Sequence, residues 1–554
     1  MRPRSANNSS IQTIVKMTRR FALWLPILFT GLIAGPAACQ ATNTQPPKLV
    51  VFITVDAMRP DYLTRFAPQL TGGLGRLYNG GAVFTNGFQD HAITETAPGH
   101  SVIMSGRYPV HTGISANTAG VNDTTVSLVD ATGLGASPFR FRGTTLTDWL
   151  MAKDPRTRIL SVSRKDRAAI LPIGRSKQPV FWYASNGIFT TSTYYGSSLP
   201  EWVRAFNARK LPSSYAGKVW QPLLPDSAYS EPDSVPIESN GINFTFPHLE
   251  ASSPDTAARL LPDFPLMDEL TLDFAMTGVN ALKLGAGPQT DLLSVSLSTT
   301  DAIGHRYGPD SREVHDQILR LDRALGVFLD SLYRIRNPSD IVVALTADHG
   351  LTPFPEVHAH DPNKGAIRVN PGPLLQQLSN SLSAAGVQGY GFNFIAGVYT
   401  GNGFDFDSGV LELDHAALNR ARINRDSLVR AVRAAFLKVP GVARADRISE
   451  LAKGDTLNDR IARRWLHMFS DEEKAALVVT LAPFNYWLSG WIAQHGSPND
   501  IDARVPIIFY GSGVKPGRYD EFAGVVDMAP TLAAIVHVTP QEKVDGHVLK
   551  HAVR

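Results

Sequence analysis

The chain has 554 residues, of which 43% are hydrophobic and 19% are charged, a composition typical of a globular protein and not of a disordered one. Its formal charge of +3 comes from the first 47 residues, which contain five basic and no acidic residues; the rest carries 48 basic against 50 acidic residues. A body so close to neutral gives no electrostatic basis for binding nucleic acid.

The N-terminal segment has the pattern of an export signal. Two arginines precede an uncharged run, Phe21 to Ala38, which contains two prolines and ends in small residues. This pattern predicts a cleaved signal peptide over residues 1–41, in preference to a membrane-spanning helix, and a periplasmic or secreted protein. Cys39 is the only cysteine, so an intrachain disulfide is excluded and a lipid anchor on Cys39 is the less favoured alternative to simple cleavage.

Apolar runs that lead into an acid are the clearest elements in the rest of the chain. Runs that are apolar on both faces predict buried parallel strands, and polar residues at the carboxyl ends of such strands are where open α/β sheets build their sites. The three runs are Leu49 to Val55 followed by Asp56, Leu292 to Leu297 leading to Asp301, and Ile341 to Ala347 followed by Asp348.

Helical segments are predicted between these runs. Residues 311–336 carry apolar side chains at helical spacing, with Asp310 or Ser311 available as N-cap. Val505 to Tyr510 is a further strand candidate, and a helix-like stretch opens at Pro530. The alternation predicts an α/β fold, with a doubly wound, mostly parallel central sheet and helices on both faces. We expect one domain over 48–554, with cap regions inserted at about 164–265 and 360–485.

Five short fragments carry the candidate chemistry. Asp301 and His305 are four residues apart, so a turn or short helix can direct both toward one ion. Taken singly, an aspartate at a strand end is more often a cap and a lone histidine is more often a solvated residue. Together the fragments supply three Asp, three His and one hydroxyl, a ligand set that suits two zinc ions: Asp56, Thr96, Asp301, His305, Asp348, His349 and His495.

This ordered set resembles the alkaline phosphatase superfamily, which includes nucleotide pyrophosphatases and phosphodiesterases. The likeness spans the chain from about Lys48 to its end. It implies one zinc ion held by Asp301, His305 and His495, a second held by Asp56, Asp348 and His349, and Thr96 as a nucleophile between them. Because a threonine hydroxyl is a weak nucleophile at neutral pH, coordination to a metal is what would activate it.

Three further residues bear on whether the substrate is a monoester or a diester. Lys165 and Arg167 are two residues apart after a short apolar run and are expected to point the same way from an extended segment. With Asn117 they are similar to the phosphate-binding set of the phosphate-irrepressible periplasmic alkaline phosphatases, single-subunit monoesterases of this superfamily. The resemblance implies that these three side chains hold the phosphoryl oxygens. Glu95, directly before Thr96, is an acid where a dianionic ligand is expected.

The prediction is therefore a zinc-dependent phosphate monoester hydrolase that acts on small phosphorylated substrates, as a monomer, through a phosphothreonine on Thr96. A phosphodiesterase or nucleotide pyrophosphatase with the same metal core is the nearest alternative. A sulfatase is less favoured, because that branch needs a cysteine or serine converted to formylglycine and Cys39 lies in the export signal. A non-catalytic binding protein is disfavoured by the complete ligand set.

Overall fold

The computed structural model describes residues 45–554 except 359–364, 388–398, 472–474 and 491. The predicted signal peptide over 1–41 and Cys39 lie outside the described residues. Within the described part of the chain, no helix is both long enough and apolar enough to cross a membrane.

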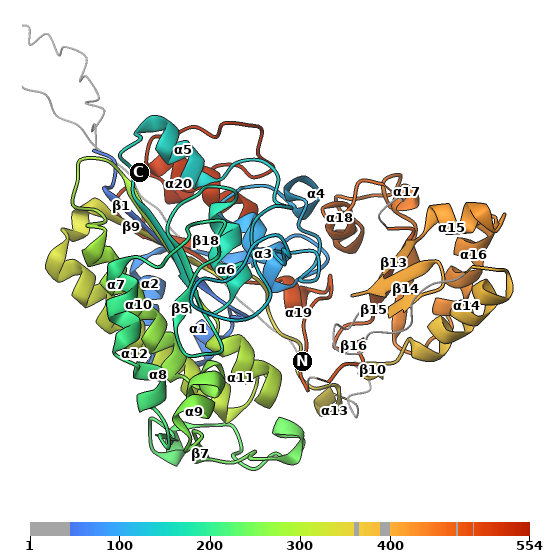
Figure 1. The fold of residues 1–554 in the computed structure, drawn as a ribbon, viewed down its shortest axis with the longest axis horizontal. Helices are drawn as coiled ribbons and strands as arrows, with labels where there is room; N and C mark the ends of the chain where they lie inside the picture. The colour runs from blue at the N-terminus through green and yellow to red at the C-terminus, as the bar shows by residue number, and fades with distance from the viewer. Residues whose placement is uncertain (1–44, 359–364, 388–398, 472–474, 491) are drawn as a thin grey trace, which may run out of the picture. The chain divides into compact units, whose positions relative to one another are not determined.

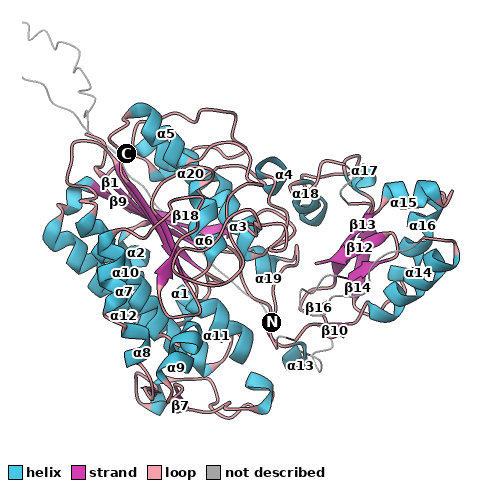
Figure 2. Ribbon diagram, viewed as in Figure 1, coloured by secondary structure: helices cyan, strands magenta, loops and turns pink. Residues whose placement is uncertain are grey.

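A nine-stranded sheet forms the centre of the fold (Figures 1 and 2). Its middle strands are parallel and pair in the order β9, β1, β8, β3 and β4, and its apolar runs are buried on both faces. In order across the sheet, the strands are β18 (Gly517–Gly524), β2 (Ala82–Phe88), β17 (Ile507–Gly511), β9 (Ile341–Thr346), β1 (Leu49–Val55), β8 (Asp291–Leu297), β3 (Ile159–Ser163), β4 (Val180–Tyr183) and β5 (Phe189–Thr190).

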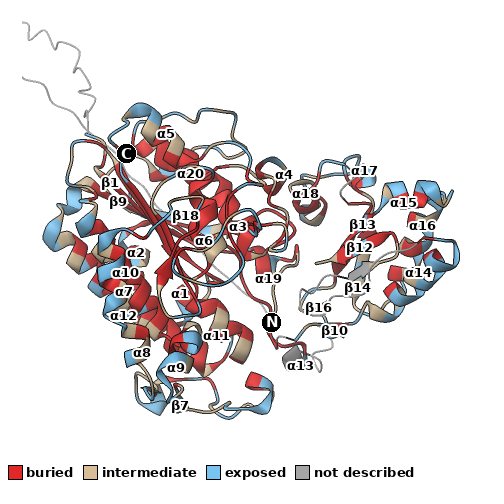
Figure 3. Ribbon diagram, viewed as in Figure 1, coloured by how far each residue is buried: buried red, intermediate tan, exposed pale blue. Residues whose placement is uncertain are grey.

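Helices cover both faces of this sheet, and burial in Figure 3 follows the sheet and the inward sides of the helices. One layer contains α2 (Gly73–Gly80), α10 (Leu266–Ala281) and α12 (Arg312–Ile335), with α12 packed on the other two. The opposite layer contains α3 (Thr96–Ile103), α5 (Leu146–Lys153), α6 (Asp166–Ile170) and α20 (Met528–Ile535). The arrangement confirms the predicted α/β fold with a mostly parallel sheet.

The predicted elements agree closely with the observed ones where the apolar pattern is long. The run Leu49–Val55 is β1 without any shift, and the long helix is α12, with Ser311 as its N-cap accepting the backbone N–H of Val314. The run near the C-terminus is β17, which is antiparallel to both β2 and β9. Its direction is set by pairing partners more than 150 residues away, which an apolar run cannot specify.

A second, five-stranded antiparallel sheet lies within the range expected to be inserted at 360–485. Its core is formed with α14 (Gly372–Ala384) and α16 (Arg425–Phe436). The strands, in order across this sheet, are β11 (Tyr399–Gly401), β12 (Phe404–Asp407), β13 (Val410–Leu413), β15 (Leu477–Leu481) and β14 (Val442–Asp446). The other expected insertion, 164–265, contains β4 and β5 of the central sheet, and the division of the chain into a domain with two insertions stays a prediction.

Candidate active site

The ends of four neighbouring strands bring the candidate residues together. Asp56 directly follows β1 and Asp348 follows β9, whereas Asp301 lies in the first turn of α11 (Thr299–Tyr307), after β8. Lys165 follows β3. Because β9, β1, β8 and β3 are adjacent and parallel, their carboxyl ends meet at one edge of the sheet. All four side chains are buried there.

The three histidines present the same ring nitrogen to this centre. The Nδ1 atoms of His305, His349 and His495 lie 2.7, 2.8 and 2.8 Å from the backbone carbonyls of Ala493, Gly350 and Thr94. A carbonyl oxygen only accepts hydrogen bonds, so each Nδ1 carries a proton and donates it. The Nε2 atoms are thereby directed toward the aspartates, the orientation that metal-ligating histidines have.

Acids and histidines form two groups with metal-ligand spacing. One consists of Asp56, Asp348 and His349, the predicted set; in the other, Asp301 and His495 are joined by the shared His349. His305, the third expected member of the second set, has its Nε2 3.3 Å from Asp301 Oδ1. The Oδ1 atom of Asp56 and the Nε2 atom of His349 are buried without a hydrogen bond. Both atoms carry lone pairs that have no hydrogen-bond partner. Such buried atoms, in a mixture of carboxylate and imidazole, fit a divalent metal of the zinc type.

The electrostatics of the centre reflect three carboxylates in a small buried volume. Burial, Asp301 and Asp348 raise the pKa of Asp56. The pKa of Asp301 is held well below its usual value, because Lys165 and the neighbouring histidines outweigh the effect of burial. Lys165 Nζ lies 2.6 Å from both Asp56 Oδ2 and Asp301 Oδ2, so its ammonium group is the cation at the middle of the site.

Thr96 is the first residue of α3, with Pro98 in the same turn, where proline is favoured. Lys165 Nζ donates to Thr96 Oγ1 at 3.2 Å. One turn later His100 is fully buried, with its Nδ1 2.8 Å from the Thr96 carbonyl and 3.2 Å from Asp348 Oδ2, and its Nε2 2.9 Å from Ser296 Oγ. No role for His100 was predicted from the sequence. Its spacing of four residues from Thr96 is the signal that places both residues on one face of a helix.

Asn117 is held by the residues on either side of Thr96. Its Oδ1 accepts the backbone N–H of Ala97 at 2.9 Å, and its own backbone N–H donates to Glu95 Oε2 at 2.7 Å. Because Oδ1 accepts from a backbone N–H, the orientation of the amide is fixed and its NH₂ group is the end that remains for a ligand. Asn117 and Thr96 line the same cavity.

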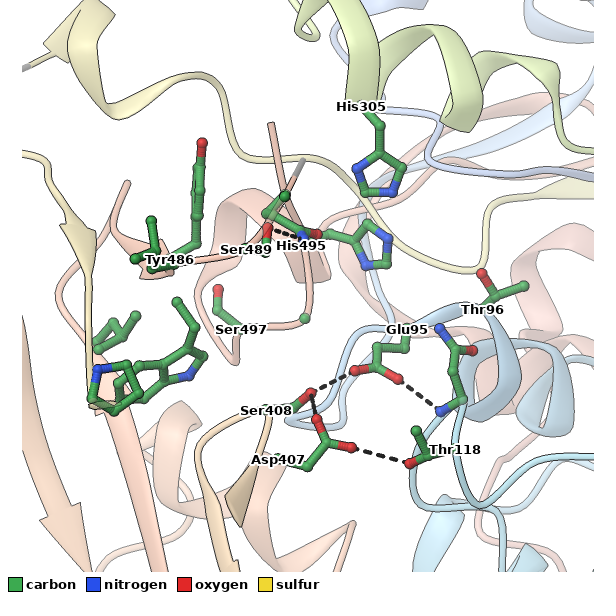
Figure 4. Close-up of a pocket in the computed structure, with 18 of the residues that line it drawn as sticks. Glu95, Thr96, Thr118, His305, Asp407, Ser408, Tyr486, Ser489, His495 and Ser497 are labelled. Atoms are coloured by element: carbon green, nitrogen blue, oxygen red, sulfur yellow. Dashed lines mark hydrogen bonds between the residues drawn. The ribbon is translucent and has the colours of Figure 1, made fainter. Parts of the chain in front are cut away.

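Glu95 is engaged by hydrogen bonds on both carboxylate oxygens. Besides Asn117, it accepts the hydroxyl of Ser408 at 2.6 Å, and Asp407 beside Ser408 accepts the hydroxyl of Thr118 at 3.0 Å (Figure 4). Burial and the charge of Glu95 raise the pKa of Asp407 to about 7. Asp407 ends β12 of the second sheet and Ser408 lies in the turn that follows it, so this acidic cluster connects the second sheet to the start of α3.

Lys165 and Arg167 reach the cavity by a different route from the one expected. Lys165 has extended backbone, but Arg167 lies in the first turn of α6 and not in an extended segment. The strand β3 ends at Ser163 and α6 begins at Asp166, so the extended segment does not reach Arg167. Both side chains still line the cavity with Thr96, and the buried Nε of Arg167 makes no hydrogen bond.

The cavity above these residues has a volume of about 1160 Å³. It is bounded by the strand ends of the central sheet, by the loop that carries His495, by the second sheet with Phe406, and by Trp487, which lies outside that sheet. A phosphoryl group fills a small part of this volume. The remainder is available to the organic part of a substrate.

Comparisons with known proteins agree with this architecture. Residues 50–371 match the family described as type I phosphodiesterase / nucleotide pyrophosphatase. The chain is 31% identical to alkaline phosphatase PhoV of Synechococcus elongatus, over 91% of this chain and 92% of that protein. It is 30% identical to alkaline phosphatase PafA of Elizabethkingia meningoseptica, over 92% of this chain and 95% of that protein.

A crystal structure of wild-type alkaline phosphatase PafA superimposes with a TM-score of 0.81 at 27% identity, covering 92% of this chain and 99% of that chain. Both the matching family and these relatives extend over the strand ends that carry the buried acids. The chain therefore belongs to the type I phosphodiesterase and nucleotide pyrophosphatase family of the alkaline phosphatase superfamily and is a phosphoric ester hydrolase.

Proposed function

We propose that the chain hydrolyses phosphate monoesters through a covalent phosphothreonine on Thr96. The observation that carries this proposal is the set of donors around the Thr96 hydroxyl. Lys165 Nζ lies 3.2 Å from Thr96 Oγ1, and Asn117 and Arg167 line the same cavity. A monoester dianion has three non-bridging oxygens, and two cations with one amide donor match that charge and number.

The metal ligands in this proposal are Asp56, Asp348 and His349 on the side of Thr96, and Asp301, His305 and His495 on the side of the leaving group. Two zinc ions held by these sets would supply Lewis-acid chemistry, lowering the pKa of a hydroxyl and offsetting negative charge. The donor set supports zinc, because neutral imidazole and carboxylate in equal number are typical zinc ligands.

The reaction follows two displacements. In the first, Thr96 Oγ forms a bond to phosphorus while the bond to the leaving oxygen breaks, and the leaving alcohol takes up the proton that the hydroxyl gives up. In the second, water forms the new bond to phosphorus and the bond to Thr96 Oγ breaks, which returns the hydroxyl and releases phosphate. Lys165, Arg167 and Asn117 hold the non-bridging oxygens in both steps. The N-terminal turn of α3 also favours negative charge next to Thr96.

The proposal is tested with the purified, zinc-supplemented protein and a matched pair of substrates, phenyl phosphate and methyl phenyl phosphate. We expect faster hydrolysis of the monoester. Thr96→Ala should abolish turnover, and Thr96→Ser should retain part of it and trap a phosphoserine at low pH. Turnover by Thr96→Ala at the wild-type rate would refute the covalent route.

A phosphodiesterase with the same centre is the second candidate, favoured by the family whose description matches residues 50–371. The two candidates differ in how they use Lys165 and Arg167. Replacing either with alanine should reduce monoester hydrolysis more than diester hydrolysis, because a diester carries one charge less and two non-bridging oxygens. An equal loss for both substrates would favour the diesterase.

We further propose export through the signal peptide over residues 1–41, with the mature protein acting as a monomer. The support is the basic, then apolar, then small-residue pattern of that segment. N-terminal sequencing of the protein recovered from the periplasm or medium tests the cleavage, and labelling with a radioactive fatty acid tests the alternative of a lipid on Cys39.

A further inference from the structure

Two arginines line the cavity without a role in the reaction described above. Arg164 precedes Lys165 at the end of β3, and Arg306 follows His305 on α11. Both contribute to the wall of the cavity that contains Thr96. A guanidinium group that is partly buried needs hydrogen-bond partners. The groups around these two arginines therefore indicate what this wall is suited to bind.

The hydrogen bonds of the two guanidinium groups leave most of their donors unused. Arg306 Nε donates to Ser239 Oγ at 2.8 Å, and Arg164 Nη2 makes a long hydrogen bond of 3.4 Å to the carbonyl of Ser298. The Nε atom of Arg164 is buried and makes no hydrogen bond. Each guanidinium offers five N–H donors, so both retain a free edge.

One carboxylate, that of Asp263, interacts with the charges of both arginines. Arg306 Nη1 is 4.0 Å from Asp263 Oδ2. Burial raises the pKa of Asp263, and the charges of Arg164 and Arg306 both act to lower it. The charged groups that line this wall are thus two guanidinium groups and one carboxylate. Asp268 is a second carboxylate near Arg164, but it is buried, accepts hydrogen bonds from Thr299 and Gln317, and does not line the cavity.

The other acids of the cavity do not neutralise this wall. Among the described residues that line it, the remaining carboxylates are Glu95, Asp301 and Asp407. Glu95 and Asp407 are bonded to one another through Ser408, and Asp301 pairs with Lys165. None of these three acids forms a described ion pair with Arg164 or Arg306, and the unused N–H donors of the two guanidinium groups are therefore available to a ligand.

The position of the two arginines relates them to the leaving group. Arg306 is adjacent to His305, which the proposed reaction places on the side of the leaving oxygen. Asp263, His305 and Arg306 also line a side pocket of about 320 Å³ that extends from the same wall. In that reaction, Lys165 and Arg167 bind the phosphoryl group. A substituent on the alcohol part of the monoester then lies on the side of His305, next to this wall.

We propose that Arg164 and Arg306 form a subsite for an anionic group on the leaving alcohol, so that the preferred substrates are phosphate monoesters whose alcohol carries a carboxylate or a second phosphate. Guanidinium groups bind these planar or tetrahedral anions with paired N–H donors. The inference rests on the proposed monoesterase function and adds the substrate class to it.

The test compares two alkyl phosphates of similar size, 3-phosphoglycerate with a carboxylate and glycerol 3-phosphate with a hydroxymethyl group. For the wild type, we expect kcat/KM to be about tenfold or more higher for 3-phosphoglycerate, the effect of one charge-assisted hydrogen-bonded pair. Arg306→Ala and Arg164→Ala should each lower the ratio of the two kcat/KM values about tenfold, mainly through KM. Arg306→Lys should restore part of the ratio, because the cation is kept.

The matched control is Arg209→Ala, which removes an exposed arginine paired with Asp273 outside the cavity and should leave both values unchanged. Thermal melting of each variant monitors folding. An unchanged ratio in both arginine variants would refute the subsite, as would a loss that is equal for the two substrates. A wild type that hydrolyses neither compound nor phenyl phosphate would instead refute the monoesterase function, and the subsite with it.

Discussion

Glu95 touches no phosphoryl oxygen in the proposed reaction, yet its replacement should lower activity strongly. Glu95→Ala removes the acceptor of the Asn117 backbone N–H at 2.7 Å and of the Ser408 hydroxyl at 2.6 Å. The segment that carries Asn117 then loses one of its two hydrogen bonds to the start of α3 and retains the one from Ala97. The amide NH₂ group of Asn117 is consequently less well placed beside Thr96.

The size of the effect follows from these two contacts. A hydrogen bond to a charged acceptor contributes about 1.5–3 kcal/mol. Loss of one preorganised donor to a developing oxyanion lowers rates about 10²–10³-fold, which sets the ceiling for Asn117→Ala. We expect Glu95→Ala to lower kcat/KM for phenyl phosphate about 10–100-fold, below that ceiling. Ser408→Ala is the matched control, because it keeps the hydrogen bond between Glu95 and Asn117. We expect it to lower kcat/KM by about threefold or less.

A double-mutant cycle provides the assay. If Glu95 acts through Asn117, Glu95→Ala combined with Asn117→Ala should be no more than about threefold worse than Asn117→Ala alone. Additive losses would refute the coupling. The reasoning also fails if Glu95→Ala increases activity, since that would show that repulsion between its carboxylate and the dianionic substrate outweighs its positioning of Asn117.

Three further predictions concern metal binding and stability. Chelation should abolish activity and lower the melting temperature, and zinc should restore both; a chelated protein with unchanged activity would contradict the metal assignment. His100→Ala should weaken zinc affinity about 10–100-fold in competition titrations, because His100 contacts Asp348, and an unchanged affinity would limit His100 to packing. Burial and Glu313 raise the pKa of Glu238 to about 9, so its contribution to stability is full below pH 4.5 and is lost as the pH rises toward 9. Glu238→Gln should therefore gain unfolding free energy over the wild type by on the order of 5 kcal/mol between pH 5 and 9 in urea titrations, at about 1.4 kcal/mol per pH unit, and a constant difference would contradict the shift.

The part of the site that follows from local pattern was predictable. Asp56 and Asp348 each follow an apolar run that can be recognised from the local sequence alone. The structure places both at one edge of the sheet. Parallel strands explain why residues nearly 300 positions apart meet. Local sequence is also consistent with the position of Thr96 at the start of α3, because Pro98 is favoured in a first turn.

Other parts depend on long-range contacts that leave no local signal. Ser408 reaches Glu95 across 313 residues, and neither residue has a neighbour in the sequence that indicates the other. Arg167 was expected in an extended segment, but the backbone turns into α6 after Lys165. The pattern of alternating side chains defines a strand but not the residue at which it ends, and the ends are where this site is built.

The pairing of β2 has a consequence for the order in which the chain folds. Its residues Ala82–Phe88 lie between β17 and β18, which are synthesised long after β2. While the ribosome is still making the chain, β2 has no lasting partner on either side, and this half of the sheet closes only after residues 507–524 emerge. The loop with His495 arrives in the same interval. A chain that stops before residue 495 therefore lacks both a finished central sheet and one of the three histidines. Such a product is open to proteolysis and has an incomplete site for the same reason.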